Sequence, residues 1–240
     1  MKILAFETSA KAGSVALLED GILLSEAYQN TGLTHSQTVL PMAQQLLENC
    51  GLTPKDVDAV AVAAGPGSFT GIRIGVAAAK GFAWGKELPC YGVSTLEAMA
   101  LQLGLTNGYI CAAMDARRSQ VYNAIFCVKE GKLERITEDR AISLEDLSED
   151  LSKLQTPVYL VGDGAELTYR TLSDRCCQLR LPPEHRRHQR AAGVALAAWQ
   201  QFHQGIPADA ATLTPNYLRL SQAERERLAR EEKEKQGESL

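Results

Sequence analysis

A glycine-rich stretch between two apolar runs constrains the fold more than any other feature of the sequence. The stretch covers residues 63–75 and reads AAGPGSFTGIRIG, with apolar runs at 57–63 and 76–84 on either side. This order predicts a buried strand, a tight loop and a helix, because glycine permits positive φ angles and close approach of other backbone. Ser68 or Thr70 is placed to cap the start of that helix.

The sequence leaves two uses of this loop open. The unpaired N–H groups at a helix N-terminus can bind an anion. The loop lacks the Gly-Lys-Ser/Thr ending of a Walker motif, and the small residues that follow it favour close packing instead. We prefer packing and keep nucleotide or anion contact as the alternative, for which the hairpin hydroxyls and the loop supply the candidates Thr8, Ser9, Gly65, Gly67, Ser68 and Arg73.

Composition is that of an ordinary globular protein. The 240 residues are 45% hydrophobic and 22% charged, and the net charge of -4 argues against a protein that holds nucleic acid by charge alone. The six cysteines form no C-x-x-C pair, which is typical of reduced thiols. An early acidic residue argues against a signal peptide, and no apolar run approaches the ~20 residues of a membrane helix. We therefore expect a cytoplasmic protein without membrane contact.

The order of predicted elements repeats along the chain. Each half reads as three strands, a helix, a strand, a glycine loop and a helix, and Asp20-Gly21 marks a hairpin in the first half. This layout predicts the α/β class, with two ribonuclease-H-like domains in tandem as in the actin, hexokinase and Hsp70 group. The predicted domains are 1–105 and 106–220, the last helix of the second one packing back on the first, followed by a charged tail at 221–240.

Side chains that would carry metal or nucleophilic chemistry are sparse. Of the four histidines only His185 and His188 are close together, and zinc needs further ligands. Ser68 does not lie in a Gly-x-Ser-x-Gly elbow. A basic cluster between Arg170 and Arg190 can meet RNA phosphates, although a solvated loop explains it about as well. We expect no metal site in this chain.

Several motifs closely resemble the TsaB (YeaZ) family over nearly the whole chain. That family is the scaffold subunit of the bacterial machinery that makes threonylcarbamoyladenosine in tRNA, beside the anticodon. The glycine loop is the longest and most specific of these motifs. The residues that carry the resemblance are 3–9, His35-Ser36 with Leu40-Pro41, 65–75, 92–96, 115–117 and 215–219.

The sister family TsaD, the catalytic transferase, places two metal-binding histidines in a His-x-x-x-His motif. Thr95 and Met99 stand at those two positions here. A hydroxyl and a thioether do not replace two imidazoles for a divalent ion. The resemblance therefore implies a non-catalytic subunit that binds no cofactor alone, with ATP and metal on the partner subunits.

The resemblance also implies partners. It indicates a heterodimer with TsaD, a homodimer when TsaD is absent, recruitment of the ATPase TsaE, and contact with tRNA through the complex. The contact would use the helices at 35–50 and 69–84, with His35, Val39, Leu40, Met42, Ala43, Leu46, Leu47, Phe69, Ile72, Arg73 and Val76. The alternative function is an ATP-dependent kinase or hydrolase of the actin-like class, or a peptidase.

Overall fold

The computed structural model describes residues 1–104 and 107–219. Two β-sheets and the helices that cover them form a mixed α/β fold, which confirms the predicted class. The predicted domain boundary between 105 and 106 and the charged tail at 221–240 lie outside the described residues. Within the described part of the chain, no helix is long and apolar enough to cross a membrane.

The first sheet has the strand order β3-β2-β1-β4-β5. Strand β1 pairs antiparallel with β2 and parallel with β4, and the hairpin between β2 and β3 turns at Asp20 and Gly21, whose φ angles are 48° and 82°. Two left-handed residues are what a tight hairpin of this kind requires. The strands are β1 (Lys2–Glu7), β2 (Gly13–Glu19), β3 (Ile22–Gln29), β4 (Ala59–Gly65) and β5 (Cys90–Ser94).

The second sheet repeats the same pattern of pairing. Its order is β11-β10-β6-β7-β8, with β6 antiparallel to β7 and parallel to β10. Two short strands here, β9 and β11, were not predicted from the sequence. The strands are β6 (Gly108–Asp115), β7 (Gln120–Lys129), β8 (Lys132–Arg135), β9 (Arg140–Ser143), β10 (Val158–Val161) and β11 (Leu179–Arg180).

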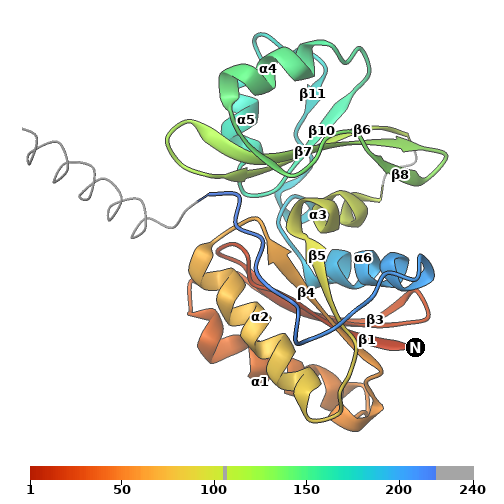
Figure 1. Ribbon diagram of the computed structural model, residues 1–240. Helices are drawn as coiled ribbons and strands as arrows, with labels where there is room; N and C mark the ends of the chain where they lie inside the picture. The colour runs from red at the N-terminus through yellow and green to blue at the C-terminus, as the bar shows by residue number, and fades with distance from the viewer. Residues whose placement is uncertain (105–106, 220–240) are drawn as a thin grey trace, which may run out of the picture.

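The helices separate into three layers (Figure 1). α1 and α2 cover the outer face of the first sheet, α3 and α6 lie between the two sheets, and α4 and α5 cover the outer face of the second sheet. Their bounds are α1 (His35–Asn49), α2 (Phe69–Trp84), α3 (Thr95–Leu103), α4 (Leu144–Ser152), α5 (Ala165–Leu172) and α6 (Ala191–His203), with short 3-10 turns at Pro54–Asp56 and Glu184–Arg186.

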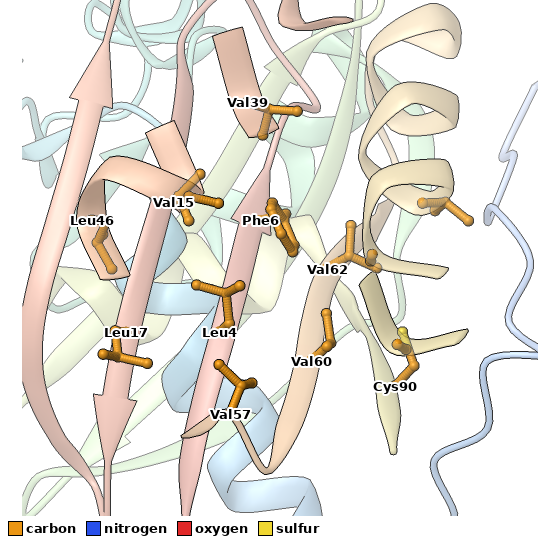
Figure 2. Packing of buried hydrophobic residues seen from close by; sticks show 14 of the residues in the cluster. Leu4, Phe6, Val15, Leu17, Val39, Leu46, Val57, Val60, Val62 and Cys90 are labelled. Carbon is orange, nitrogen blue, oxygen red and sulfur yellow. The ribbon is translucent and has the colours of Figure 1, made fainter. Parts of the chain in front are cut away.

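Alternation along the strands decides which side chains meet which helices. Leu4 and Phe6 of β1 point toward α1 and α2, as Figure 2 shows, and pack there with Val60 and other buried residues. Ile3 and Ala5 point the other way and meet α6. Since successive strand residues face opposite sides, a fully apolar strand is one that is covered on both faces.

The two middle helices connect the sheets. α6 comes last along the chain among the described helices but packs on the first sheet through its alanines and Val194. A Cβ placed on Gly193 of α6 would lie only 2.1 Å from the carbonyl oxygen of Ala98 in α3, so glycine is needed for this contact. On its opposite side α3 packs Leu96 and Met99 against the second sheet.

Two leucines of α1 provide a matched test of this packing. Leu46 is 2% exposed in the core, whereas Leu40 is 49% exposed on the outer face of the same helix. Leu46→Ala should lower the free energy of unfolding by about 2–5 kcal/mol, because it leaves a cavity. Leu40→Ala should change it by no more than about 0.5 kcal/mol. Urea denaturation measures both; equal effects would contradict the burial described here.

Candidate functional site

A cleft of about 600 Å³ lies between the two sheets. Its walls are the turn between β1 and β2, the glycine loop before α2, the end of β6, and residues 216–219 of the C-terminal segment. Lys11, Arg117 and Arg219 bring positive charge to the cleft, and Asp115 and Asp163 bring negative charge. The glycine loop thus borders a cavity between the sheets, where such loops led us to expect one.

The glycines of the loop are required by close backbone contact. A Cβ on Gly67 would lie 2.5 Å from the carbonyl oxygen of Ser9, and one on Gly71 would lie 2.1 Å from that of Thr8. A Cβ on Gly75, one turn further along α2, would lie 2.3 Å from the hydroxyl oxygen of Thr8. All three distances are shorter than any real side chain tolerates, so the first turns of α2 rest directly on the β1–β2 turn.

Hydrogen bonds complete this contact. The Thr8 hydroxyl donates to the carbonyl of Gly71 over 2.8 Å, and the Ser68 hydroxyl accepts from the Gly71 N–H at 3.2 Å. Ser68 is therefore the N-cap of α2, one of the two caps that the sequence predicted. The Ser68 N–H donates to the carbonyl of Ser9 at 2.6 Å. These groups bind one another, which is the packing use of the loop.

Only some of the predicted anion-binding residues line the cleft. Ser9, Gly67 and Ser68 line the cleft, whereas the Thr8 hydroxyl is already bonded within the protein. Gly65 is covered by the C-terminal segment, since a Cβ there would lie 2.3 Å from the carbonyl oxygen of Asn216.

Arg73 turns toward an aromatic pair at the edge of the cleft. Its Nε donates to the Tyr217 hydroxyl over 2.8 Å, and its guanidinium lies 4.0 Å from the ring centre of Phe69. Phe69 and Tyr217 stack with ring centres 4.3 Å apart. Sequence reasoning missed this pairing, because nothing local to Arg73 indicates a partner in the C-terminal segment.

Two carboxyl groups with raised pKa values lie at or near the cleft: Asp163 lines it, and Glu7 ends β1 two residues before Ser9, which also lines it. Glu7 is 1% exposed, and its pKa is raised to about 7: burial raises it most, hydrogen bonding from Ser9 opposes the rise, and nearby Asp163 adds to it. One Glu7 oxygen accepts the Ser9 N–H at 2.5 Å, while the other has no partner among the described residues. Burial also raises the pKa of Asp163, whose Oδ1 accepts from Gln189 Nε2 at 2.9 Å. A charged residue ending an apolar strand was the only sequence signal for Glu7.

The two positions of the sister family's metal ligands are deep in the protein. Thr95 is the first residue of α3 and is fully buried, and Met99 packs in the core between α3 and the second sheet. Within residues 1–104 and 107–219, no three His, Cys, Asp or Glu side chains converge as a metal site would need. His185 is exposed, and His188 lies 3.8 Å from Glu184.

Burial corrects the predicted partner surface in six places. Val39, Ala43, Leu46, Leu47, Ile72 and Val76 belong to the core between α1, α2 and the first sheet. An amphipathic helix buries its apolar stripe against its own sheet first, and these six side chains have no surface left to offer. Met42 also packs partly against this core, and His35 Nε2 lies 2.7 Å from the carbonyl oxygen of Ala10. Leu40 and Arg73 are exposed, and Phe69 is half-buried.

Several arginines of the basic cluster between Arg170 and Arg190 make contacts within the chain. Arg190 pairs with Glu26 at 2.7 Å, and Arg170 pairs with Glu166. Arg186 donates to the carbonyl of Leu103 over 2.6 Å. These contacts account for part of the cluster without any nucleic acid.

The fold and the site define a class: mixed α/β proteins with two sheets of repeated topology and a polar cleft between them. A family model described as "TsaD: tRNA N6-adenosine threonylcarbamoyltransferase" matches residues 29–227. The chain is 34% identical to the tRNA threonylcarbamoyladenosine biosynthesis protein TsaB of Bacillus subtilis, over 93% of this chain and 96% of that protein. It is 40% identical to the Escherichia coli protein of the same name, over 68% of this chain and 72% of that protein.

Solved structures agree with these relatives. YeaZ from Pseudomonas aeruginosa superposes with a TM-score of 0.71 at 26% identity, covering 90% of this chain and 99% of that one. A second Pseudomonas aeruginosa structure, described as similar to peptidase YEAZ, superposes with a TM-score of 0.73 at 26% identity and covers 91% of this chain and 99% of that one. The chain belongs to the TsaB (YeaZ) family.

Replacing Glu7 should remove a pH dependence of stability. The pKa of Glu7 rises from 4.5 to about 7 on folding, so the folded state keeps a proton that the unfolded state releases. The free energy of unfolding should therefore be highest below about pH 4.5 and fall by on the order of 3 kcal/mol as the pH rises through about 7.

Urea titrations at about pH 5 and about pH 8 check this expectation. Glu7→Gln should lose most of the difference between the two conditions, whereas Glu149→Gln, at an exposed site on α4, should keep it. A Glu7→Gln protein with the pH dependence of the unmodified chain would show that another group is responsible.

Proposed function

We propose that this chain is a non-catalytic scaffold subunit required for the threonylcarbamoyl modification of tRNA adenosine beside the anticodon. In this proposal it pairs with TsaD, supports the TsaD active site and recruits the ATPase TsaE. The names of its relatives supply the pathway. The observation that carries the scaffold role is the pair Thr95 and Met99, buried at the positions where the sister family holds its metal.

Chemistry supports this assignment of roles. Neither a threonine hydroxyl nor a methionine thioether is a strong ligand for a hard or borderline divalent ion, and both side chains are enclosed by core residues. The glycine loop is occupied by the β1–β2 turn of the same chain. We therefore assign ATP and metal to the partner subunits and no cofactor to this chain alone.

The architecture we propose is two ribonuclease-H-like domains in tandem. Its support is the common strand order and strand direction of the two sheets, three antiparallel strands followed by two parallel ones. Component A of (R)-2-hydroxyglutaryl-CoA dehydratase has a similar fold, with a TM-score of 0.50 at 13% identity. We also place the protein in the cytoplasm, because the proposed role is on tRNA.

The outer faces of α1 and α2 are the surface we assign to TsaD, or to a second copy when TsaD is absent. With six of the predicted side chains in the core, the contact would rest on exposed apolar residues near them. Trp84 at the end of α2 is 78% exposed, and Leu33 and Leu40 on the α1 side are 57% and 49% exposed. Large exposed apolar side chains on or beside two neighbouring helices favour an interface there, with Leu33 just before α1, Leu40 in the N-terminal half of α1 and Trp84 at the C-terminal end of α2.

Reconstitution tests the scaffold role. The purified chain alone should transfer no threonylcarbamoyl group to tRNA, and its addition to TsaD and TsaE should restore transfer, because it supplies structure rather than chemistry. Radiolabelled threonine incorporated into tRNA measures both. Transfer by the chain alone, or full activity of TsaD and TsaE without it, would contradict the proposal. ATP turnover or peptide cleavage by the isolated chain would favour the kinase, hydrolase or peptidase alternative.

Substitutions on the outer helix faces test the pairing surface. Leu40→Asp and Trp84→Ala should each weaken the complex with TsaD by roughly ten-fold or more, since central apolar anchors dominate interface energy. Ile136→Asp is the control, because Ile136 is 53% exposed but follows β8 on the second sheet. Calorimetric titration with TsaD measures the affinities. Unchanged affinity for both helix variants would place the contact elsewhere.

A further inference from the structure

The C-terminal segment 206–219, which we name the strap, runs from the end of α6 across the first sheet and returns to the cleft. Figure 1 shows it in blue, passing beside α2 on its way to the gap between the sheets. Its residues form walls of two cavities, the cleft of about 600 Å³ and a second cavity of about 340 Å³ beside β5. Access to both cavities therefore depends on where the strap lies.

The middle of the strap is held by contacts to the first sheet and to α2. The N–H of Asn216 donates to the carbonyl of Ala64 over 2.7 Å. Leu213 lies against Gly92 of β5, where a Cβ would come within 2.4 Å of it. Lys80 of α2 donates to the carbonyl of Leu213 at 3.0 Å.

The end of the strap is held at the surface. Tyr217 is 38% exposed and is fixed by its stack on Phe69 and by the hydrogen bond from Arg73, a group we name the fastening. Both partners come from the first turns of α2. Contacts of this kind are individually modest, so an exposed group of three can open without unfolding the core.

Two residues beyond the fastening, the strap crosses to the other sheet. Arg219 donates to the carbonyl of Ala116 over 2.7 Å, at the turn between β6 and β7. In that turn Arg117, Arg118 and Ser119 have φ angles of 62°, 57° and 57°, a left-handed run that is unfavourable without glycine. The Arg219 bond is thus a tether between the fastening on the first sheet and a strained turn on the second.

We propose that the strap is a clamp across the cleft, released at the fastening when a partner binds the N-terminal end of α2. Arg73 is exposed on α2 and Phe69 is only half-buried, so a partner there would compete with Tyr217 for both. Loss of the fastening would free Arg219, relax the β6–β7 turn and widen the cleft. The release step rests on the scaffold function proposed above, whereas the clamp itself does not.

Hydrogen exchange of the free protein tests the clamp. Tyr217→Ala should raise exchange of the Asn216 amide and of the Ala116 amide, which donates to Gln120 at 3.0 Å, by about ten-fold each. Arg219→Ala should raise exchange at Ala116 but leave Asn216 nearly unchanged. Ile22→Ala, which removes a side chain 68% exposed at the β2–β3 hairpin, is the control and should change neither. Unchanged exchange at Ala116 in both strap variants would overturn the clamp.

Exchange in the presence of TsaD tests the release. Saturating TsaD should raise exchange at Ala116 in the unmodified chain, and should add little in Tyr217→Ala, where the strap is already free. Unchanged or slower exchange at Ala116 in a bound complex would overturn the release and leave the scaffold function standing. Absence of TsaD binding by calorimetry would instead remove the scaffold function and with it the release, while the clamp would still stand on the free-protein result.

Discussion

The contact between the β1–β2 turn and the first turns of α2 is the constraint on which the cleft depends. Backbone and hydroxyl atoms of Thr8 and Ser9 approach Gly67, Gly71 and Gly75 at distances that exclude any side chain. Because α2 cannot move away without exposing the turn, the helix start, its Ser68 cap and the wall of the cleft are set together. A loop of phosphate-binding appearance thus packs on one side against the protein's own β1–β2 turn, while Gly67 and Ser68 still line the cleft.

The cleft beside that loop is lined mainly by polar groups. The lining includes the carboxyl of Asp163, and Glu7 is buried nearby at the end of β1; burial raises the pKa of both groups. Within the described residues no three His, Cys, Asp or Glu side chains converge there, and Thr95 and Met99, which the resemblance matches to the sister family's metal ligands, are core residues. These features accord with the scaffold role that we propose for this member of the TsaB family.

The proposed partner surface and the cleft share α2. One side of the helix packs Ile72 and Val76 into the core, its N-terminal end rests on the β1–β2 turn, and Phe69 and Arg73 hold the strap. A single rigid helix that meets the core, the cleft and the outer surface can connect events on the surface to the cleft, because packed elements move as units. Arg219 extends this connection to the second sheet through its bond to Ala116.

Short-range sequence patterns predicted much of the secondary structure. The Asp20-Gly21 hairpin, the Ser68 cap and the repeated order of elements follow from turn geometry and short-range periodicity, and the motifs indicated the family. The sequence did not reveal the two-residue strand β11, or that Val39 and Leu46 are core residues, since an apolar stripe looks the same whether a sheet or a partner covers it. Nor did it pair Arg73 with Tyr217, 144 residues away. Contacts within a few residues are set by local propensity, whereas contacts across the chain exist only once the sheets and helices have packed.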